Sequence, residues 1–211
     1  MRLYIDVETY RPDKDKAFTG EKIIVIGVIE DRTPYDQSSA SIWDPPPVKT
    51  LYFKEWELGG EREVVIEFYN YLRGLVDELG NRKSFIVVNG FNILRYDIPL
   101  LIQKGVEYGI GSLGELNALW HNTLTVDYMQ VFLCANGMRF RGLKLQHLAR
   151  IAKEKGIAVP TPHGSGEDVR KWYEDGKFDD IIRHIEADLR ILRMIDLNHK
   201  KLLDESDGGK H

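Results

Sequence analysis

The sequence predicts an α/β fold in which a central mixed β-sheet is flanked by helices. Two observations carry this prediction. Runs typical of strands come mainly in the first half of the 211 residues, and amphipathic helical patterns interleave with them and then dominate the second half. We expect one domain over 1–205, with a surface insertion at about 32–49 and a flexible tail at 206–211.

The predicted strands are short runs of apolar, largely β-branched residues. They are RLYID (2–6), KIIVIGVIED (22–31), TLYFKE (50–55), SFIVVNG (84–90) and LTVD (124–127). The fourth run is continuously apolar at its centre, which is typical of a strand in the middle of a sheet.

Helices are predicted where apolar residues recur at helical spacing. The first covers 61–79 and has its apolar stripe at Val64, Val65, Phe68, Leu72, Leu75 and Leu79. A second follows the strand at 84–90 and ends near Gly105 or Gly109. The remaining helical patterns cover 143–156, 166–176 and 178–204.

The composition indicates a cytoplasmic (intracellular) protein without membrane contact. No apolar run approaches the roughly 18 residues that a membrane-spanning helix needs, and the first residues lack a signal-peptide pattern. The single cysteine, Cys134, excludes an internal disulfide. A formal net charge of −4 means that any binding to nucleic acid must use a local basic patch.

Two acidic residues, Asp6 and Glu8, lie at the end of the first strand run, where apolar residues are expected. Residues two apart on a strand project from the same face, so these carboxylates would point together, with Val7 on the other face. Acidic residues are depleted in strands, and an unpaired buried charge is costly. Either the strand ends at Ile5 and the acids belong to a solvated loop, or a cation lies against them.

Two later stretches add acids at positions that suit a site. Asp97 follows the strand 84–90 at a strand-to-helix turn, the usual ligand-binding end of an α/β sheet, although it is also a candidate N-cap for the next helix. His184 and Asp188 are four residues apart and share one face of a helix. Their alternative role is an exposed charge pair on a solvated face.

Taken together, DVET, GFNILRYD and HIEAD have the order and approximate spacing of the three exonuclease motifs of the DEDD superfamily. The chain also resembles stand-alone exonucleases related to the exonuclease domain of family B DNA polymerases. That likeness extends through VDYMQVF, LKLQHLARIAKEKGI and the DGKFDDI that leads into the third motif. The resemblance implies a ribonuclease H-like fold and 3′–5′ exonuclease activity.

Carried over to this chain, the resemblance implies that four carboxylates bind two divalent cations, Mg²⁺ or Mn²⁺. These carboxylates are Asp6, Glu8, Asp97 and Asp188. Oxygen ligands suit such hard cations, and two of them would offset the repulsion among the four acids. His184 would orient or deprotonate the attacking water.

The spacing of this histidine departs from the usual third motif, which has Tyr four residues or His five residues before the last Asp. His199 and Asp204 have the five-residue spacing, but they lie near the end of the sequence, and we favour His184 and Asp188.

Candidate substrate contacts lie in two segments. Arg139, Arg141 and Lys144 surround Phe140, a mixture suited to phosphate contact and base stacking, or else a solvated basic loop. The other candidates are near the acid motifs: Thr9, Phe91 and Asn92, of which Phe91 could equally belong to the core.

The leading hypothesis is a metal-dependent exonuclease that trims single-stranded 3′ ends, with DNA favoured over RNA. Its partners would be these 3′ ends and, through the resemblance, replication or repair proteins; the oligomeric state is not predicted. Alternatives are a 3′–5′ exoribonuclease, a catalytically inactive nucleic-acid-binding module and a structure-selective endonuclease. The presence of all four acids argues against the inactive module.

Overall fold

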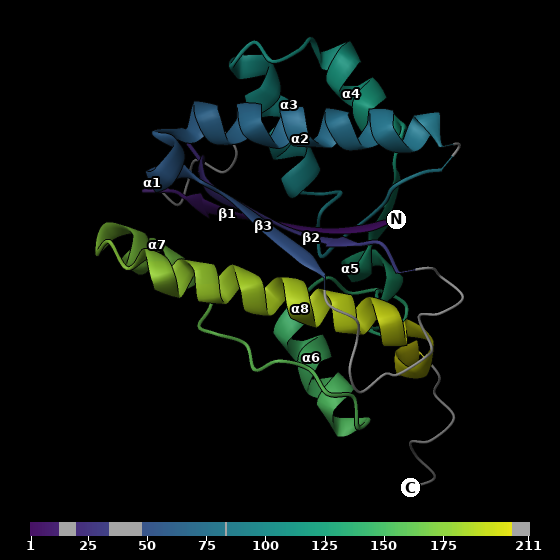
Figure 1. The fold of residues 1–211 in the computed structure, drawn as a ribbon. Helices are drawn as coiled ribbons and strands as arrows, with labels where there is room; N and C mark the ends of the chain where they lie inside the picture. The colour runs from purple at the N-terminus through teal and green to yellow at the C-terminus, as the bar shows by residue number, and fades with distance from the viewer. Residues whose placement is uncertain (13–19, 34–47, 83, 204–211) are drawn as a thin grey trace, which may run out of the picture.

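A computed structural model describes residues 1–12, 20–33, 48–82 and 84–203. Most of the predicted insertion and all of the predicted tail lie outside these ranges. The described chain has the predicted α/β fold: a mixed sheet forms the middle layer, and helices cover both of its faces (Figure 1).

The sheet has the order β3-β2-β1-β4-β5 in the described part of the chain. Its strands are β1 (Arg2–Tyr10), β2 (Lys22–Asp31), β3 (Lys49–Lys54), β4 (Val87–Gly90) and β5 (Leu124–Asp127). The first three strands pair antiparallel, whereas β4 runs parallel to both β1 and β5. The carboxyl ends of β1, β4 and β5 therefore meet at one edge of the sheet.

Two groups of helices enclose this sheet. One face is covered by α2 (Glu61–Asn81), with α3 (Asp97–Glu107) and α4 (Leu113–His121) beside it; the other is covered by α8 (Phe178–Leu203), with α6 (Leu145–Glu154) and α7 (Gly166–Glu174) (Figure 1). Two single-turn helices complete the set, α1 (Glu55–Leu58) and α5 (Tyr128–Val131). All six residues of the apolar stripe predicted for 61–79 are buried, and each large one stabilises the fold by roughly 1.5–3 kcal/mol.

Alternation along β1 decides which way its acids face. Leu3, Ile5 and Val7 belong to the hydrophobic cluster under α2, whereas Tyr4 belongs to the cluster under α8. Because side chains alternate between the faces of a strand, Asp6 and Glu8 project toward α8, as predicted.

The structure corrects several expected boundaries. The first strand does not end near Asp6 but continues to Tyr10, so the two acids lie within it and not in a solvated loop. The strand expected at 84–90 begins only at Val87. Three helices were not predicted from the sequence: α1, α4 and α5. Of these, α4 had a readable signal, since Ser112 and Glu115 form a capping box at its start. Among the described helices, none combines the length and the apolar character needed to cross a membrane.

Candidate active site

The site is built on the face of β1 that α8 covers. Asp6 lies opposite Gly27 of β2, and the absence of a side chain at Gly27 lets α8 come close. A Cβ atom there would lie 2.8 Å from the terminal methyl groups of both Ile185 and Leu189. These two residues flank Asp188 on α8, so the close packing brings Asp188 toward Asp6.

His184, one turn before Asp188, is buried and held at both ring nitrogens. Its Nδ1 donates a hydrogen bond to the carbonyl oxygen of His163 (2.6 Å). Its Nε2 lies 3.2 Å from a carboxylate oxygen of Glu8 and 3.9 Å from one of Asp188. The bond to His163 fixes the orientation of the ring, so that Nε2 faces the acids. The four-residue spacing therefore does bring the imidazole to the carboxylates.

The electrostatics of these groups follow from burial and from one another's charge. Burial, and then the negative charges of Glu8, Asp188 and Asp97, raise the pKa of Asp6 well above its usual range. Burial likewise raises the pKa of Asp188 to about 6, although the neighbouring imidazole opposes this. Burial alone would lower the pKa of His184, but the hydrogen bond and the charge of Glu8 outweigh it and raise the value to about 10. The site therefore holds excess negative charge, of which His184 compensates a part.

Asp97 comes from a different segment: it lies at the end of the turn that connects β4 to α3. It is the first residue of α3, and the N-cap is Tyr96, so the N-cap alternative for Asp97 was wrong. Burial is the main reason that its pKa rises to about 7, and the charge of Glu8 adds to the effect. Asp97 is thus close enough to the β1 carboxylates for their charges to interact.

Asp127 is an acid that was not among the predicted site residues. It is the last residue of β5 and is buried, and its carboxylate accepts hydrogen bonds from the backbone N–H groups of Asn92 (2.9 Å), Leu94 (3.2 Å) and Met129 (2.9 Å). Asn92 has a left-handed backbone, with φ at 65°. Asp127 therefore fixes the turn from which Asp97 projects. Its position at the carboxyl end of a strand, close to the signal that marked Asp97, could have identified it.

The residues suit divalent cations in their donor chemistry. Asp6 Oδ2 and Asp188 Oδ1 are buried and make no hydrogen bond in the part of the chain that the structure describes. Buried carboxylate oxygens without partners are costly, and a hard cation would satisfy them. Among the described residues, no three His, Cys, Asp or Glu side chains are gathered tightly enough to hold a metal ion as they stand. The fit thus rests on donor type and uncompensated charge.

A cleft of about 910 Å³ lies next to the segments that carry Glu8 and Asp97, although none of the four carboxylates is among its lining residues. Thr9, next to Glu8, lines it together with Tyr96, and their hydroxyl oxygens are 3.2 Å apart. Its cationic residues are Arg11, Lys144, Arg170 and Lys171, and its acidic ones are Glu21, Glu167 and Glu174. Arg11 and Arg170 are paired with carboxylates, whereas no ion pair involves Lys144 or Lys171 within the described ranges. The lining thus has four cationic and three acidic side chains, a small excess of positive charge.

The predicted substrate contacts fall into two groups. Thr9 and Lys144 line the cleft, and Asn92 has a buried Oδ1 without a hydrogen bond in the described part of the chain. Arg139 and Arg141 are exposed in the loop before α6 and are not among the residues that line the cleft. Phe91 is half-buried and packs against the α8-side core, which is the alternative that the sequence left open.

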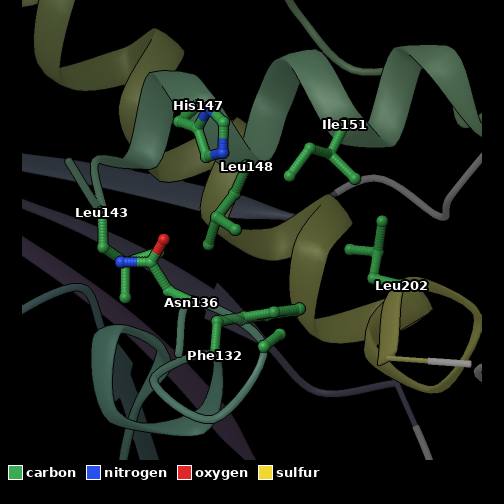
Figure 2. A pocket seen from close by; sticks show the side chains of 8 residues that line it. Phe132, Asn136, Leu143, His147, Leu148, Ile151 and Leu202 are labelled. Atoms are coloured by element: carbon green, nitrogen blue, oxygen red, sulfur yellow. The ribbon is translucent and has the colours of Figure 1, made fainter. Parts of the chain in front are cut away.

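A smaller hollow, shown in Figure 2, lies between the loop after α5, helix α6 and the end of α8. Its volume is about 70 Å³, and its lining is mainly apolar, including Phe132, Leu148 and Leu202. None of the four carboxylates lines it. This chemistry does not suit a cation.

Comparison with known proteins supports the fold by structure and not by sequence. No protein-family model and no curated protein sequence matches the chain. Solved structures do match. The mixed sheet and its flanking helices are similar to those of exonucleases, which is consistent with a ribonuclease H-like fold.

Two of these structures illustrate the likeness. The family B DNA polymerase of Pyrobaculum calidifontis matches with a TM-score of 0.58 and 17% identity, over 95% of this chain and 24% of the polymerase. Exonuclease I of E. coli, in a zinc-bound complex with single-stranded DNA, matches with a TM-score of 0.50 and 12% identity, over 96% of this chain and 42% of exonuclease I. The chain thus spans less than half the length of either protein. At these identities the comparison establishes the fold.

Proposed function

We propose that the protein is a two-metal-ion 3′–5′ exonuclease that hydrolyses phosphodiester bonds at the 3′ ends of single-stranded nucleic acid, with DNA favoured. The observation that carries this proposal is the cluster on β1, α3 and α8. Carboxylates from three distant sequence segments interact there through their charges, and oxygens of Asp6 and Asp188 are buried without hydrogen bonds in the described chain. The structural likeness to exonuclease I and to a polymerase supports it.

In this proposal Asp6, Glu8, Asp97 and Asp188 hold two divalent cations, Mg²⁺ or Mn²⁺. When bound, such ions lower the pKa of a coordinated water and offset charge on the phosphate in the transition state. Lys144 and Lys171 attract the strand into the cleft through its phosphates. His184 orients the attacking water, while the His163 carbonyl keeps the ring in place. With its pKa raised to about 10, the ring is protonated in the metal-free protein. Cations bound to Glu8 and Asp188 would offset the negative charges that raise this pKa, and Nε2 could then accept the proton of the water.

The test uses 5′-labelled and 3′-labelled oligonucleotides, as DNA and as RNA, with Mg²⁺, Mn²⁺ or a chelator. We expect a ladder that shortens from the 3′ end when metal is present, and its loss in Asp6→Ala. Asp77→Ala is the matched control, because Asp77 is exposed on α2, far from the cluster. The relative rates of hydrolysis of DNA and RNA show which of the two is the preferred substrate. Absence of metal-dependent cleavage of any end by the wild-type protein would refute the proposal.

A further inference from the structure

We propose that Arg95 and Phe140 form a stacking platform on which a base of the single strand rests while its 3′ end occupies the carboxylate cluster. This inference rests on the proposed function and adds to it a base-binding position outside the metal cluster. We call these two residues the stacking platform.

Arg95 and Phe140 lie against each other at the surface. The guanidinium carbon of Arg95 lies 4.3 Å from the centre of the Phe140 ring. Both side chains are exposed, with 43% of Phe140 accessible. Arg95 also places Nη1 4.0 Å from the sulfur of Met129, and it makes no ion pair in the described part of the chain. A planar cation and an aromatic ring are thus available together at the surface.

The loop that carries Phe140 is held in shape. The side-chain amide of Asn136 donates hydrogen bonds to the carbonyl oxygens of Arg139 and Arg141, on either side of Phe140. Leu143 anchors the end of the loop in the core near α6, and Figure 2 shows Asn136 and Leu143 on the same side of the small hollow. Such a preorganised loop loses less conformational entropy when a ligand binds.

The platform is also tied to the cluster. Arg95 belongs to the turn that Asp127 fixes, two residues before Asp97. Its neighbour Tyr96 lines the cleft, and so does Lys144, which follows the Phe140 loop. The two segments that form the platform therefore also contribute residues to the cleft wall.

The charge around the platform favours nucleic acid as the occupant. Arg139, Arg141 and Lys144 are exposed, and none makes an ion pair within the described residues. Free cations beside an exposed aromatic ring suit a chain of phosphates and bases, and stacking tolerates any base. A duplex already stacks both faces of its internal bases, so the platform would select single strands.

The experiment compares a long and a minimal substrate. Hydrolysis of oligothymidylate requires the whole binding surface, whereas thymidine 5′-monophosphate p-nitrophenyl ester carries one nucleotide and no strand to stack. We expect the ratio of their kcat/KM values to fall about tenfold in Phe140→Ala and in Arg95→Gln, the loss typical of one stacked base. Phe140→Trp keeps an aromatic face and should retain the wild-type ratio.

Phe85→Ala is the matched control, since Phe85 is also an exposed aromatic residue but precedes β4, at the other end of that strand. A ratio in Phe140→Ala equal to that in Phe85→Ala would overturn the platform and leave the proposed function intact. If the wild-type protein hydrolysed neither substrate, the proposed function would fail. Fluorescence anisotropy of labelled oligothymidylate would then decide: selective weakening of binding in Phe140→Ala supports the platform, and equal binding rejects it.

Discussion

His184 reaches the acids although its spacing, four residues before Asp188, is unusual for the motif. Its ring is oriented by the His163 carbonyl at one nitrogen and by Glu8 at the other, while Trp172 packs against its edge. The loop under Trp172 leaves no room for a side chain at Gly164, where a Cβ would lie 2.2 Å from the indole. The tertiary contacts, and not the helical spacing alone, place the imidazole among the acids.

Replacing His184 with Ala should lower kcat by roughly 10²–10⁴-fold with metal present, because the attacking water loses its proton acceptor. KM should change far less, since no substrate contact is removed. Single-turnover cleavage of a labelled oligonucleotide measures the effect. His121→Ala, on the exposed surface of α4, is the control. A His184→Ala rate within about twofold of the wild-type rate would remove the base role but leave the metal cluster standing.

Asp127 should be a positioning residue whose loss is felt at Asp97. Asp127→Ala leaves three buried or half-buried backbone N–H groups without an acceptor, so we expect a loss of about 2–3 kcal/mol in unfolding free energy. Asp127→Asn keeps one acceptor oxygen and should lose less. Urea denaturation measures the unfolding free energies of the wild-type protein and the two variants, and kcat should fall in the same order as stability. Equal stability of Asp127→Ala and the wild-type protein would contradict the assigned role.

Among single residues, those whose position follows from the alternation of a strand or the repeat of a helix could be predicted from the sequence. Alternation along a strand was enough to place Asp6 and Glu8 on one face. The role of Asp127 could not be read in the same way, because its partners are backbone groups of a turn more than 30 residues away in sequence. Similarly, His163 acts through its carbonyl oxygen, which every residue has, and its ring pairs with Asp180 at 3.0 Å without a telling spacing.

Among the elements, the contact between β2 and α8 controls the geometry of the cluster. Gly27 lies opposite Asp6, directly beneath Ile185 and Leu189. The antiparallel β1–β2 pair thus supplies both the acid and the space that the helix needs. A side chain at this position must displace the ends of the Ile185 and Leu189 side chains, which belong to the helix that carries His184 and Asp188.

Gly27→Ala should therefore destabilise the fold by about 1–2 kcal/mol, because the added methyl group overpacks a tight contact. Activity should fall further than stability explains if the strain is relieved by a shift of α8 away from β1. Gly74→Ala in α2 is the matched control: nothing lies within 4 Å of its added Cβ, and alanine favours a helix. Thermal melts and kcat for both variants check this. Wild-type activity in Gly27→Ala would show that the helix position does not depend on this glycine.

Element lengths explain which parts of the fold were predictable. The boundaries of β2 and β5 were predicted correctly, and those of α2 and α8 came within a few residues, because each long helix has a clear apolar period. The end of α3 was also close, but its start was predicted too early, since α3 begins only at Asp97. The helices α1 and α5 have four residues each, too few to show a period. The extension of β1 to Tyr10 was missed because its acids are depleted in strands, and only the tertiary environment compensates for them.

At the scale of the whole molecule, the separation of charge matters more than its sum. The net charge of −4 suggests no attraction to nucleic acid. In the structure, however, the acids converge on one end of β1, while exposed cations lie along the cleft and the Phe140 loop. A strand drawn in by its phosphates would therefore meet the acids only with compensating cations between them.

This arrangement predicts a stability that depends on both pH and metal. The pKa values of Asp97 (about 7) and Asp188 (about 6) lie above their unfolded value near 4. The folded state therefore binds these protons more tightly than the unfolded state, and the metal-free protein should lose stability as pH rises from about 4 to about 8. The raised pKa of His184 acts in the same direction, but its contribution is lost only as pH rises from about 6.5 through about 10.

Divalent cations bind the deprotonated carboxylates, so the melting temperature should rise more with Mn²⁺ at about pH 8 than at about pH 5.5. Thermal denaturation with Mn²⁺ or with a chelator at both pH values measures this difference. Asp6→Asn should abolish most of the metal-dependent rise, while Asp77→Asn, at the exposed control position, should keep it. Asp97→Asn should make the metal-free protein more stable at about pH 8, by about 2 kcal/mol, because a buried charge is removed. A metal-induced rise that is equal at the two pH values would mean that the cations bind elsewhere, and the carboxylate cluster would lose its proposed role.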